Sequence, residues 1–177
     1  MLVQFANKSS SVLIATDVAA RGLDIKDLEA VINFELSPDP DIHIHRIGRT
    51  GRAGNAGLAL SLFMASEAKK VTAIEDFQNS NVQMDKTGSL KAREDFSLSP
   101  PMVTLCINGG RKNKVRAGDI LGALTVNPNL TGKQIGKIDI SDYHAHVAVE
   151  RPIAKQALKT LAEGKIKGRR FRVYKLR

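Results

Sequence analysis

The sequence predicts two small units, an α/β unit followed by an α+β unit, joined by a polar linker. Strand-like apolar runs alternate with helical segments in residues 1–78, and a different alternation of strand and helix periods follows in residues 102–177. Residues 79–101 are rich in turn formers and show no sustained period. The chain has 177 residues, 42% of them hydrophobic, so each unit has enough apolar material to bury a core.

In the front unit, short apolar runs predict strands at 12–16, 30–35 and 58–63. A helix is expected over 66–78, with Ser66 as its cap. The first strand runs into a glycine-containing loop, and strand ends of this kind are where α/β proteins bind ligands. We therefore expect one end of a parallel sheet with a ligand site at its strand ends.

Three arginines, Arg46, Arg49 and Arg52, follow one another at three-residue spacing with glycines between them. On a helical turn these positions lie near one face, so their guanidinium groups would point in similar directions. Guanidinium groups bind phosphate oxygens in bidentate fashion, and an arginine at a γ-phosphate stabilises charge during phosphoryl transfer. The spacing therefore predicts a phosphate site in preference to a solvated basic turn.

A second candidate site follows the first expected strand. The Thr16 hydroxyl and the N–H groups after it are suited to a phosphate, and Asp24 is suited to accept hydrogen bonds from a sugar hydroxyl. The alternative for Thr16 and Asp17 is a helix N-cap, because both residue types cap helices well.

Residues 15–25 (ATDVAARGLDI) and 45–54 (HRIGRTGRAG) resemble motifs V and VI of the DEAD-box RNA helicases, in the family's order and at a suitable separation. The resemblance implies that residues 1–78 are a partial RecA-like helicase C-terminal domain of the P-loop NTPase type. It also implies roles for single residues: Arg49 and Arg52 as catalytic arginine fingers on ATP, Asp24 on the ribose, Thr16 and Gly22 on the RNA backbone, and His45 and Arg46 in coupling the two sites. His43 lies outside the motif and receives no role.

The chain lacks the sequence motifs with which such helicases hold the nucleotide. It contains no G-x-x-x-x-G-K-[ST] loop, no Asp-Glu-Ala-Asp run and no Ser-Ala-Thr motif. Phosphoryl transfer needs the phosphate cradle and the Mg²⁺ that these motifs provide. We therefore expect ATP and Mg²⁺ to bind only together with a complete N-terminal RecA-like domain, and no ATP hydrolysis by this chain alone. The start at Met1 resembles a domain cut before motif V, for which a truncated gene or a fragment is the simplest explanation.

Positive charge is concentrated in the rear unit. Residues 1–84 hold 8 Lys and Arg against 10 Asp and Glu, a net charge of −2, whereas residues 101–177 hold 16 against 5, a net charge of +11. Such asymmetry indicates a polyanionic partner, most often nucleic acid. A membrane is not expected, because no apolar stretch approaches the roughly 20 residues of a spanning helix.

The cysteine content and the N-terminus bear on location. Cys106 is the one cysteine, so an internal disulfide is excluded and a reducing compartment is favoured. The N-terminus lacks the basic-then-apolar pattern of a signal peptide. We expect a cytoplasmic protein and a monomer.

The rear unit reads as strand, helix, strand, strand, helix, strand. The expected strands are 102–107, 138–140, 143–149 and 169–176, and the expected helices are 117–125 and 152–164. This order is the split β-α-β plan of ferredoxin-like folds, which the RRM family of RNA binders shares. The fold class is therefore α/β in front and an α+β, RRM-like βαββαβ domain behind.

The outer face of the rear sheet is expected to be polar and almost without aromatic rings. Alternation along the strands assigns to it Thr104, Cys106, Lys137, Asp139, His144, His146, Arg170, Arg172 and Tyr174. The RNP1 pattern of RRM domains is absent. Base stacking on Tyr174 or on the two histidines remains open, although ordinary surface histidines are favoured. No metal site is expected, because no third ligand with suitable spacing accompanies the histidines.

Two basic, glycine-containing loops, 109–116 and 165–172, give the strongest nucleic-acid signal. Backbone phosphate contacts supply most nucleic-acid affinity, so we expect these flexible segments to contact phosphates. The candidate RNA-binding residues are Arg111, Lys112, Lys114, Arg116, Lys165, Lys167, Arg169, Arg170, Arg172 and Tyr174.

Residues 101–177 also resemble the C-terminal domain of a bacterial branch of the DEAD-box family. The segments 110–112, 118–125, 135–138 and 164–169 carry this resemblance. It implies an RRM-like module that directs a helicase to a hairpin of large-subunit ribosomal RNA, with ribosomal RNA and the pre-ribosomal particle as partners. Two functions remain open: the rear part of an ATP-dependent RNA helicase, and a non-enzymatic module that binds ribosomal RNA.

Overall fold

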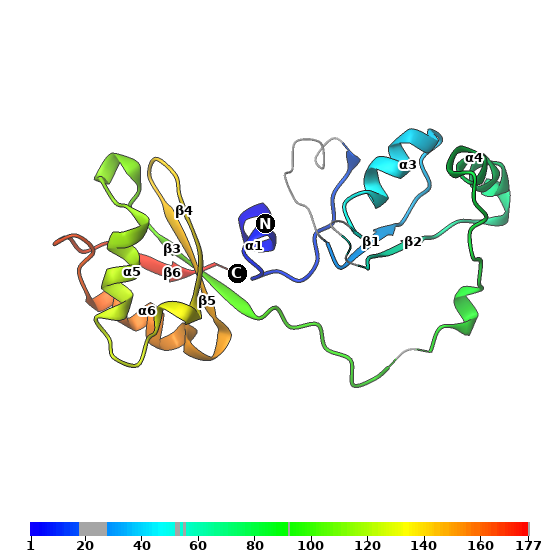
Figure 1. Ribbon diagram of the computed structural model, residues 1–177. Coiled ribbons are helices and arrows are strands. Elements are labelled where there is room, and N and C mark those ends of the chain that lie inside the picture. The colour runs from blue at the N-terminus through cyan, green and yellow to red at the C-terminus, as the bar shows by residue number, and fades with distance from the viewer. Residues whose placement is uncertain (18–27, 52–53, 55, 92, 177) are drawn as a thin grey trace. The chain divides into compact units, whose positions relative to one another are not determined.

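The computed structural model describes residues 1–17, 28–51, 54, 56–91 and 93–176 (Figure 1). The chain divides into two compact units. Met1–Ala15 and Asp95–Arg177 form one, the C-terminal unit, and Thr16–Glu94 form the other, the motif unit. Residues 1–15, which the sequence grouped with the front unit, thus lie in the same unit as residues 95–177. The expected domain boundaries at 78 and 101 stay predictions.

The C-terminal unit contains a four-stranded antiparallel sheet with strand order β4-β5-β3-β6. Its elements are β3 (Met102–Ile107), α5 (Ala117–Thr125), β4 (Ile135–Ile140), β5 (Ala145–Glu150), α6 (Ala154–Glu163) and β6 (Val173–Lys175). Both helices lie on one face of the sheet (Figure 1). The expected β-α-β-β-α-β order is confirmed.

Alternate strand residues and one stripe of each helix meet in a single core. Leu105 and Ile107 of β3 and Val147 of β5 are fully buried, as are Ile120 of α5 and Leu161 of α6 at 1% exposure or less. The strand residues are spaced by two, so they share the inner face. Burial of each such side chain stabilises the fold by about 1.5–3 kcal/mol, which makes this core the main source of stability of the unit.

Of the residues expected on the outer face, Thr104, Cys106, Lys137, Asp139, His146 and Tyr174 lie on strands, whereas His144, Arg170 and Arg172 lie outside them; part of this face is covered. Thr104 and Cys106 are only 1% and 2% exposed. The Asn7 side chain donates to Thr104 Oγ1 at 2.8 Å, and the Ser9 and Thr104 hydroxyls are 2.6 Å apart. These partners follow α1 (Leu2–Ala6). The expectation that Thr104 and Cys106 face solvent is therefore wrong, because a segment distant in sequence supplies the cover.

The motif unit has a smaller sheet, in which β1 (Ala30–Asn33) pairs in parallel with β2 (Leu58–Ser61). Helix α3 (Pro40–Ile47) and helix α4 (Ala68–Gln78) complete it, with a 3-10 turn over Ala65–Glu67. Ser66 is not the helix cap: it lies inside the 3-10 turn, whose N-cap is Met64, and the N-cap of α4 is Glu67.

The strand expected at 12–16 is not formed. Val12 and Ile14 are 58% and 90% exposed. A strand needs a neighbour to satisfy its N–H and C=O groups, and within the described residues β1 and β2 pair with each other alone. The buried hydrophobic cluster of this unit consists of Leu36, Val71 and Ile74.

Candidate functional site

Arg46 and Arg49 do not lie on one continuous helix, and Arg52 lies outside the described residues. Helix α3 ends at Ile47; the Gly48 N–H donates to the Ile44 carbonyl at 2.8 Å, and the Arg49 N–H donates to the Arg46 carbonyl at 3.2 Å. Arg46 thus belongs to the last turn of the helix, whereas Arg49 lies in the turn that follows. The expected common helical face is therefore wrong for Arg46 and Arg49, because glycine-containing turns end the helix between them and continue to Gly51, which has φ 66°.

Arg46 joins the two motif segments. Its Nε and Nη2 donate to the two carboxylate oxygens of Asp17, each at 2.7 Å, and its Nη1 donates to the Glu35 carbonyl at 2.8 Å. The hydrogen bond to Asp17 raises the pKa of Arg46. A bidentate pair of this kind fixes direction as well as distance, so it holds residue 17 of the first motif segment against α3.

The pairing partner of Arg46 was missed by sequence reasoning, which considered Asp17 only as a cap. Opposite charges in the two motif segments were the available signal. The coupling role of Arg46 stays a prediction. His45, assigned the same role, is exposed, and its Nδ1 lies 2.9 Å from the Asp41 carbonyl oxygen.

His43, which received no role, is buried at 6% exposure beside Arg46. Burial lowers its pKa, and the positive charge of Arg46 lowers it further. Its Nδ1 is buried without a hydrogen-bond partner among the described residues. Burial and the nearby positive charge thus both favour the neutral form of the His43 ring.

The remaining candidates of the front unit are placed only in part. Thr16 is exposed and Arg49 is half-buried, and both take part in interactions. Gly22, Asp24 and Arg52 lie outside the described residues. Their assigned roles stay predictions.

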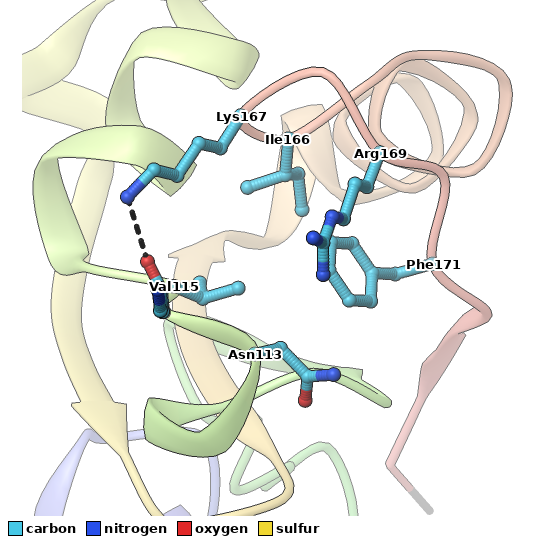
Figure 2. Close-up of a pocket in the computed structure, with 7 residues that line it drawn as sticks. Asn113, Val115, Ile166, Lys167, Arg169 and Phe171 are labelled. Atoms are coloured by element: carbon cyan, nitrogen blue, oxygen red, sulfur yellow. Dashed lines mark hydrogen bonds between the residues drawn. The ribbon is translucent and has the colours of Figure 1, made fainter.

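The two basic loops of the C-terminal unit meet around one pocket (Figure 2). The Lys167 ammonium donates to the Lys114 carbonyl at 3.1 Å, and the Asn108 N–H donates to the Arg172 carbonyl at 2.9 Å. We call the space between the two loops the loop pocket; its volume is about 120 Å³. It is lined by Asn113, Lys114, Val115, Ile166, Lys167, Arg169 and Phe171. A second hollow, formed in part by Arg111 and Arg116, adjoins it and shares both lysines.

Backbone hydrogen bonds close both loops, and the expectation that they are flexible stays a prediction. In the second loop, Ile166 and Arg169 exchange two backbone hydrogen bonds of 2.8 and 3.1 Å. In the first, the Gly110 carbonyl accepts from the N–H groups of Asn113 and Val115. The Arg111 N–H also donates to the Ser141 carbonyl. These backbone hydrogen bonds, which composition does not reveal, define the main-chain path from which the exposed basic side chains project.

Two lysines of the loops adopt left-handed backbone conformations. Lys114 has φ 61° and Lys167 has φ 52°. For a residue with a Cβ this conformation costs roughly 1–2 kcal/mol, and such strain concentrates at binding sites. The observation marks the loop pocket as a candidate site that sequence patterns alone do not reveal.

The candidate RNA-binding side chains of both loops, and Tyr174 beside them, are exposed to solvent. The Arg172 guanidinium lies over the Tyr174 ring, 6.0 Å from its centroid. A hydrogen bond with Cys106 raises the pKa of Tyr174. Within the described residues there is no group of three His, Cys, Asp or Glu that fits a metal ion, and no helix meets the length and hydropathy needed to cross a membrane.

Comparison with known families matches both parts of the chain. Residues 104–175 match the DbpA RNA binding domain, and residues 1–54 match the helicase conserved C-terminal domain.

Individual relatives match over most of the chain. The ATP-dependent RNA helicase DbpA of Escherichia coli (strain K12) is 52% identical over 97% of this chain and 37% of its own length. DbpA of Bacillus subtilis (strain 168) is 32% identical over 92% of this chain and 38% of its own length. The ATP-dependent RNA helicase RhlB of Shewanella sp. (strain W3-18-1) is 38% identical over 67% of this chain and 27% of its own length. The chain thus spans less than two fifths of the length of these relatives.

Proposed function

This chain belongs to the DbpA-type DEAD-box RNA helicases, whose C-terminal portion it matches, and from this premise we propose that it binds ribosomal RNA through the two basic loops of its C-terminal unit. The bound RNA is a hairpin of the large ribosomal subunit RNA. The cellular setting is the assembly of that subunit on a pre-ribosomal particle in the cytoplasm, with the protein acting as a monomer.

The observation that carries the proposal is the convergence of the basic loops. Their cations lie on segments about fifty residues apart in sequence, yet Lys167 reaches the Lys114 carbonyl. Acidic residues are few in this part of the chain, since residues 101–177 carry 5 Asp and Glu against 16 Lys and Arg. When clustered Lys and Arg side chains neutralise phosphates, the counterions condensed on the RNA are released, and this release drives RNA binding.

RNA binding by this surface is tested with large-subunit ribosomal RNA transcripts, measured by fluorescence anisotropy at several salt concentrations. Replacing Lys114 and Lys167 by Gln should weaken binding and lower the slope of log K against log salt by about 0.7–0.9 for each phosphate that is no longer neutralised. The matched control replaces Lys133 and Lys155, exposed lysines outside both loops, by Gln. An equal loss of affinity in both double variants would contradict the proposal.

In the complete helicase, Arg49 and Arg52 act on ATP, and Asp24 contacts its ribose. Thr16 and Gly22 contact the RNA backbone. ATP and Mg²⁺ are held by a complete N-terminal RecA-like domain, so this chain alone does not hydrolyse ATP. The geometry that supports this arrangement is the Arg46–Asp17 pair, which holds Asp17, within the first motif segment, next to α3.

An ATPase assay tests this role. The purified chain should show no RNA-stimulated turnover. Addition of the N-terminal RecA-like domain of a DbpA-type helicase should restore some turnover, and Arg52→Ala should abolish what is restored. Turnover by the chain alone would overturn the proposal.

A second function, RNA binding without any role for ATP, is favoured by the separate core of the C-terminal unit. If the chain acts only in this way, its RNA affinity should be the same with and without nucleotide and N-terminal domain, and Arg49→Ala should have no effect in either assay.

A further inference from the structure

We propose that the segment Met1–Ser10, docked on the outer face of the C-terminal sheet, supplies Lys8 as a further phosphate contact for an RNA strand that leaves the two basic loops. RNA bound in this way also holds the segment on the sheet. This inference rests on the proposed RNA binding by the loops and adds to it a contact from a part of the chain far from them in sequence.

A small set of polar contacts docks the segment on the sheet. The Asn7 amide and the Ser9 hydroxyl both reach the Thr104 hydroxyl. The Met102 N–H donates to the Lys8 carbonyl at 3.2 Å. Asn7 is 4% exposed, whereas all residues of α1 are at least partly exposed. Polar bonds therefore hold the segment in place of an apolar core, and a contact of this kind opens at low cost and responds readily to a ligand.

Lys8 shares an unusual backbone conformation with the two lysines of the loop pocket. Its φ is 61°, compared with 61° for Lys114 and 52° for Lys167. The left-handed region is unfavourable for a residue with a Cβ, and such strain concentrates at binding sites. The Lys8 N–H donates to the Phe5 carbonyl at 3.1 Å, and the Lys8 carbonyl accepts from Met102. Hydrogen bonds on both sides therefore fix Lys8 in the conformation of the lysines already proposed to bind phosphate.

The Lys8 side chain is exposed, and within the described residues it belongs to no ion pair. Residues 1–16 contain no Asp or Glu. Docking of the segment thus adds positive charge to a unit that already has an excess of it. Electrostatic attraction to a polyanion therefore favours the docked state of the segment.

The distance from the loops to Lys8 is within reach of one RNA strand. Met102, which bonds Lys8, begins β3, and Asn108, which follows β3, donates to the Arg172 carbonyl of the second loop. Asn108 lies six positions after Met102. At about 3.3 Å per strand residue, these positions span about 20 Å. Phosphates of one stacked strand follow one another about every 3.4 Å, so roughly six nucleotides cover this distance.

The outer face between these points is uncharged along β3 and β6. It is formed by Thr104 and Cys106 of β3 and by Tyr174 of β6, which pairs with Cys106. The Arg172 guanidinium stands over the Tyr174 ring, at the end next to the loops. Arg172 and Lys8 thus mark the two ends of a path on which a phosphate backbone meets no opposing charge.

The test uses the large-subunit ribosomal hairpin that the chain binds most tightly, alone and with single-stranded uridine extensions of about four or about eight nucleotides at either end. Lys8→Gln removes the charge and keeps a Cβ, so the backbone requirement at this position is unchanged. Measured by fluorescence anisotropy, it should weaken binding of the longer extended hairpin several-fold and lower its slope of log K against log salt by about 0.7. Binding of the bare hairpin should be unchanged.

The matched control is Lys155→Gln, which removes an exposed lysine outside the segment and both loops. It should bind bare and extended hairpins as the native chain does.

A second variant shows whether Lys8 acts through docking. Thr104→Val removes the hydroxyl that holds Asn7 and Ser9 and changes no charge. It should reproduce the loss for the extended hairpin, and adding Lys8→Gln should then have no further effect. Hydrogen exchange at the Met102 N–H, measured in the native chain, reports docking directly. The extended hairpin should slow this exchange, and the bare hairpin should not.

The outcomes separate this inference from the proposed RNA binding. Equal losses for bare and extended hairpins in Lys8→Gln, or no loss for either, would overturn the contact. Additive losses in the double variant would show that Lys8 acts without docking and would overturn the coupling. Faster exchange at Met102 with the extended hairpin would mean that RNA displaces the segment, which also overturns it. In each case, binding of the bare hairpin leaves the proposed function standing, whereas absence of binding to every RNA would overturn both.

Discussion

The two units of this chain differ in how far they bury their apolar residues. In the C-terminal unit, Leu105, Ile107 and Val147 are fully buried between the sheet and its helices. In the motif unit, Ile32 on β1 is 64% exposed and Phe34 just after it is 78% exposed.

This difference separates two kinds of information in the sequence. The motif segments consist largely of polar residues, two of which, Arg46 and Asp17, form a bidentate ion pair within the motif unit. The sequence of the C-terminal unit also encodes a packed core, which includes Val115 and Ile166 of the two basic loops. Stability and site geometry should therefore respond to substitution differently in the two units.

The largest effect is expected from the core. Leu105→Ala should lower the free energy of unfolding of the C-terminal unit by about 2–5 kcal/mol, because it leaves a cavity. Ile32→Ala, at an exposed position, should change stability by less than about 0.5 kcal/mol. Urea unfolding followed by circular dichroism measures both, and tyrosine fluorescence isolates the C-terminal unit, which holds Tyr143 and Tyr174. Similar losses of stability in both variants would contradict the contrast between the units.

The docked segment Met1–Ser10 should be released by Thr104→Val. This change keeps the side-chain shape but removes the hydroxyl that bonds Asn7 and Ser9, leaving the buried Asn7 amide without that partner. The cost is about 1–3 kcal/mol. Trypsin should then cut at Lys8 faster than in the native chain. Thr125→Val, which removes an exposed hydroxyl bonded to the Leu121 carbonyl, is the control and should not change the cleavage rate.

A smaller effect is expected from the ion pair of the motif unit. Arg46→Gln leaves Asp17 without its bidentate partner and should cost about 1–2 kcal/mol, since both side chains are partly exposed. Hydrogen exchange at the Gly48 N–H, which closes α3, should become faster. His45→Gln affects an exposed contact with Asp41 and should leave the exchange rate nearly unchanged. Equal protection in both variants would show that the pair does not hold α3.

The smallest effect concerns pH. Burial lowers the pKa of His146, and neighbouring His144 lowers it further, against an opposing effect of Asp139. The folded state therefore favours the neutral ring. Its contribution to stability is complete above the ordinary pKa of 6.5 and is lost as the pH falls through 6.5 towards the lower pKa of the folded state.

His146→Gln should accordingly flatten the fall in stability of the C-terminal unit between about pH 7.5 and pH 5.5. Tyrosine fluorescence during urea unfolding provides the measurement. His43, whose pKa is also lowered by burial, contributes the same dependence to the motif unit, and this should remain in the variant. An unchanged slope of the C-terminal unit would contradict the assignment to His146.

Elements with strong local periods could be predicted to the residue. The strand at 102–107 and the helix at 117–125 have the bounds that alternation and helical spacing indicated. The start of the last strand, expected at residue 169, could not be predicted in this way. Arg169 is part of a tight turn with Ile166, and β6 begins at Val173.

Features that depend on distant partners escaped sequence reasoning. The burial of Thr104 needs Asn7, and the absence of a strand at 12–16 reflects missing strand neighbours among the described residues. For the candidate site, the sequence identified the basic side chains. Their convergence through Lys114 and Lys167 depends on backbone hydrogen bonds that no pattern of residue types encodes.

At Lys114 and Lys167, which have left-handed backbone conformations, thermal stability and the proposed RNA binding favour different residues. Glycine or asparagine at 114 or 167 would relieve the backbone and raise the melting temperature. Each such exchange also removes a positive charge from the surface proposed to bind RNA. Selection for thermal stability alone would therefore favour residues at these positions that weaken the proposed RNA binding.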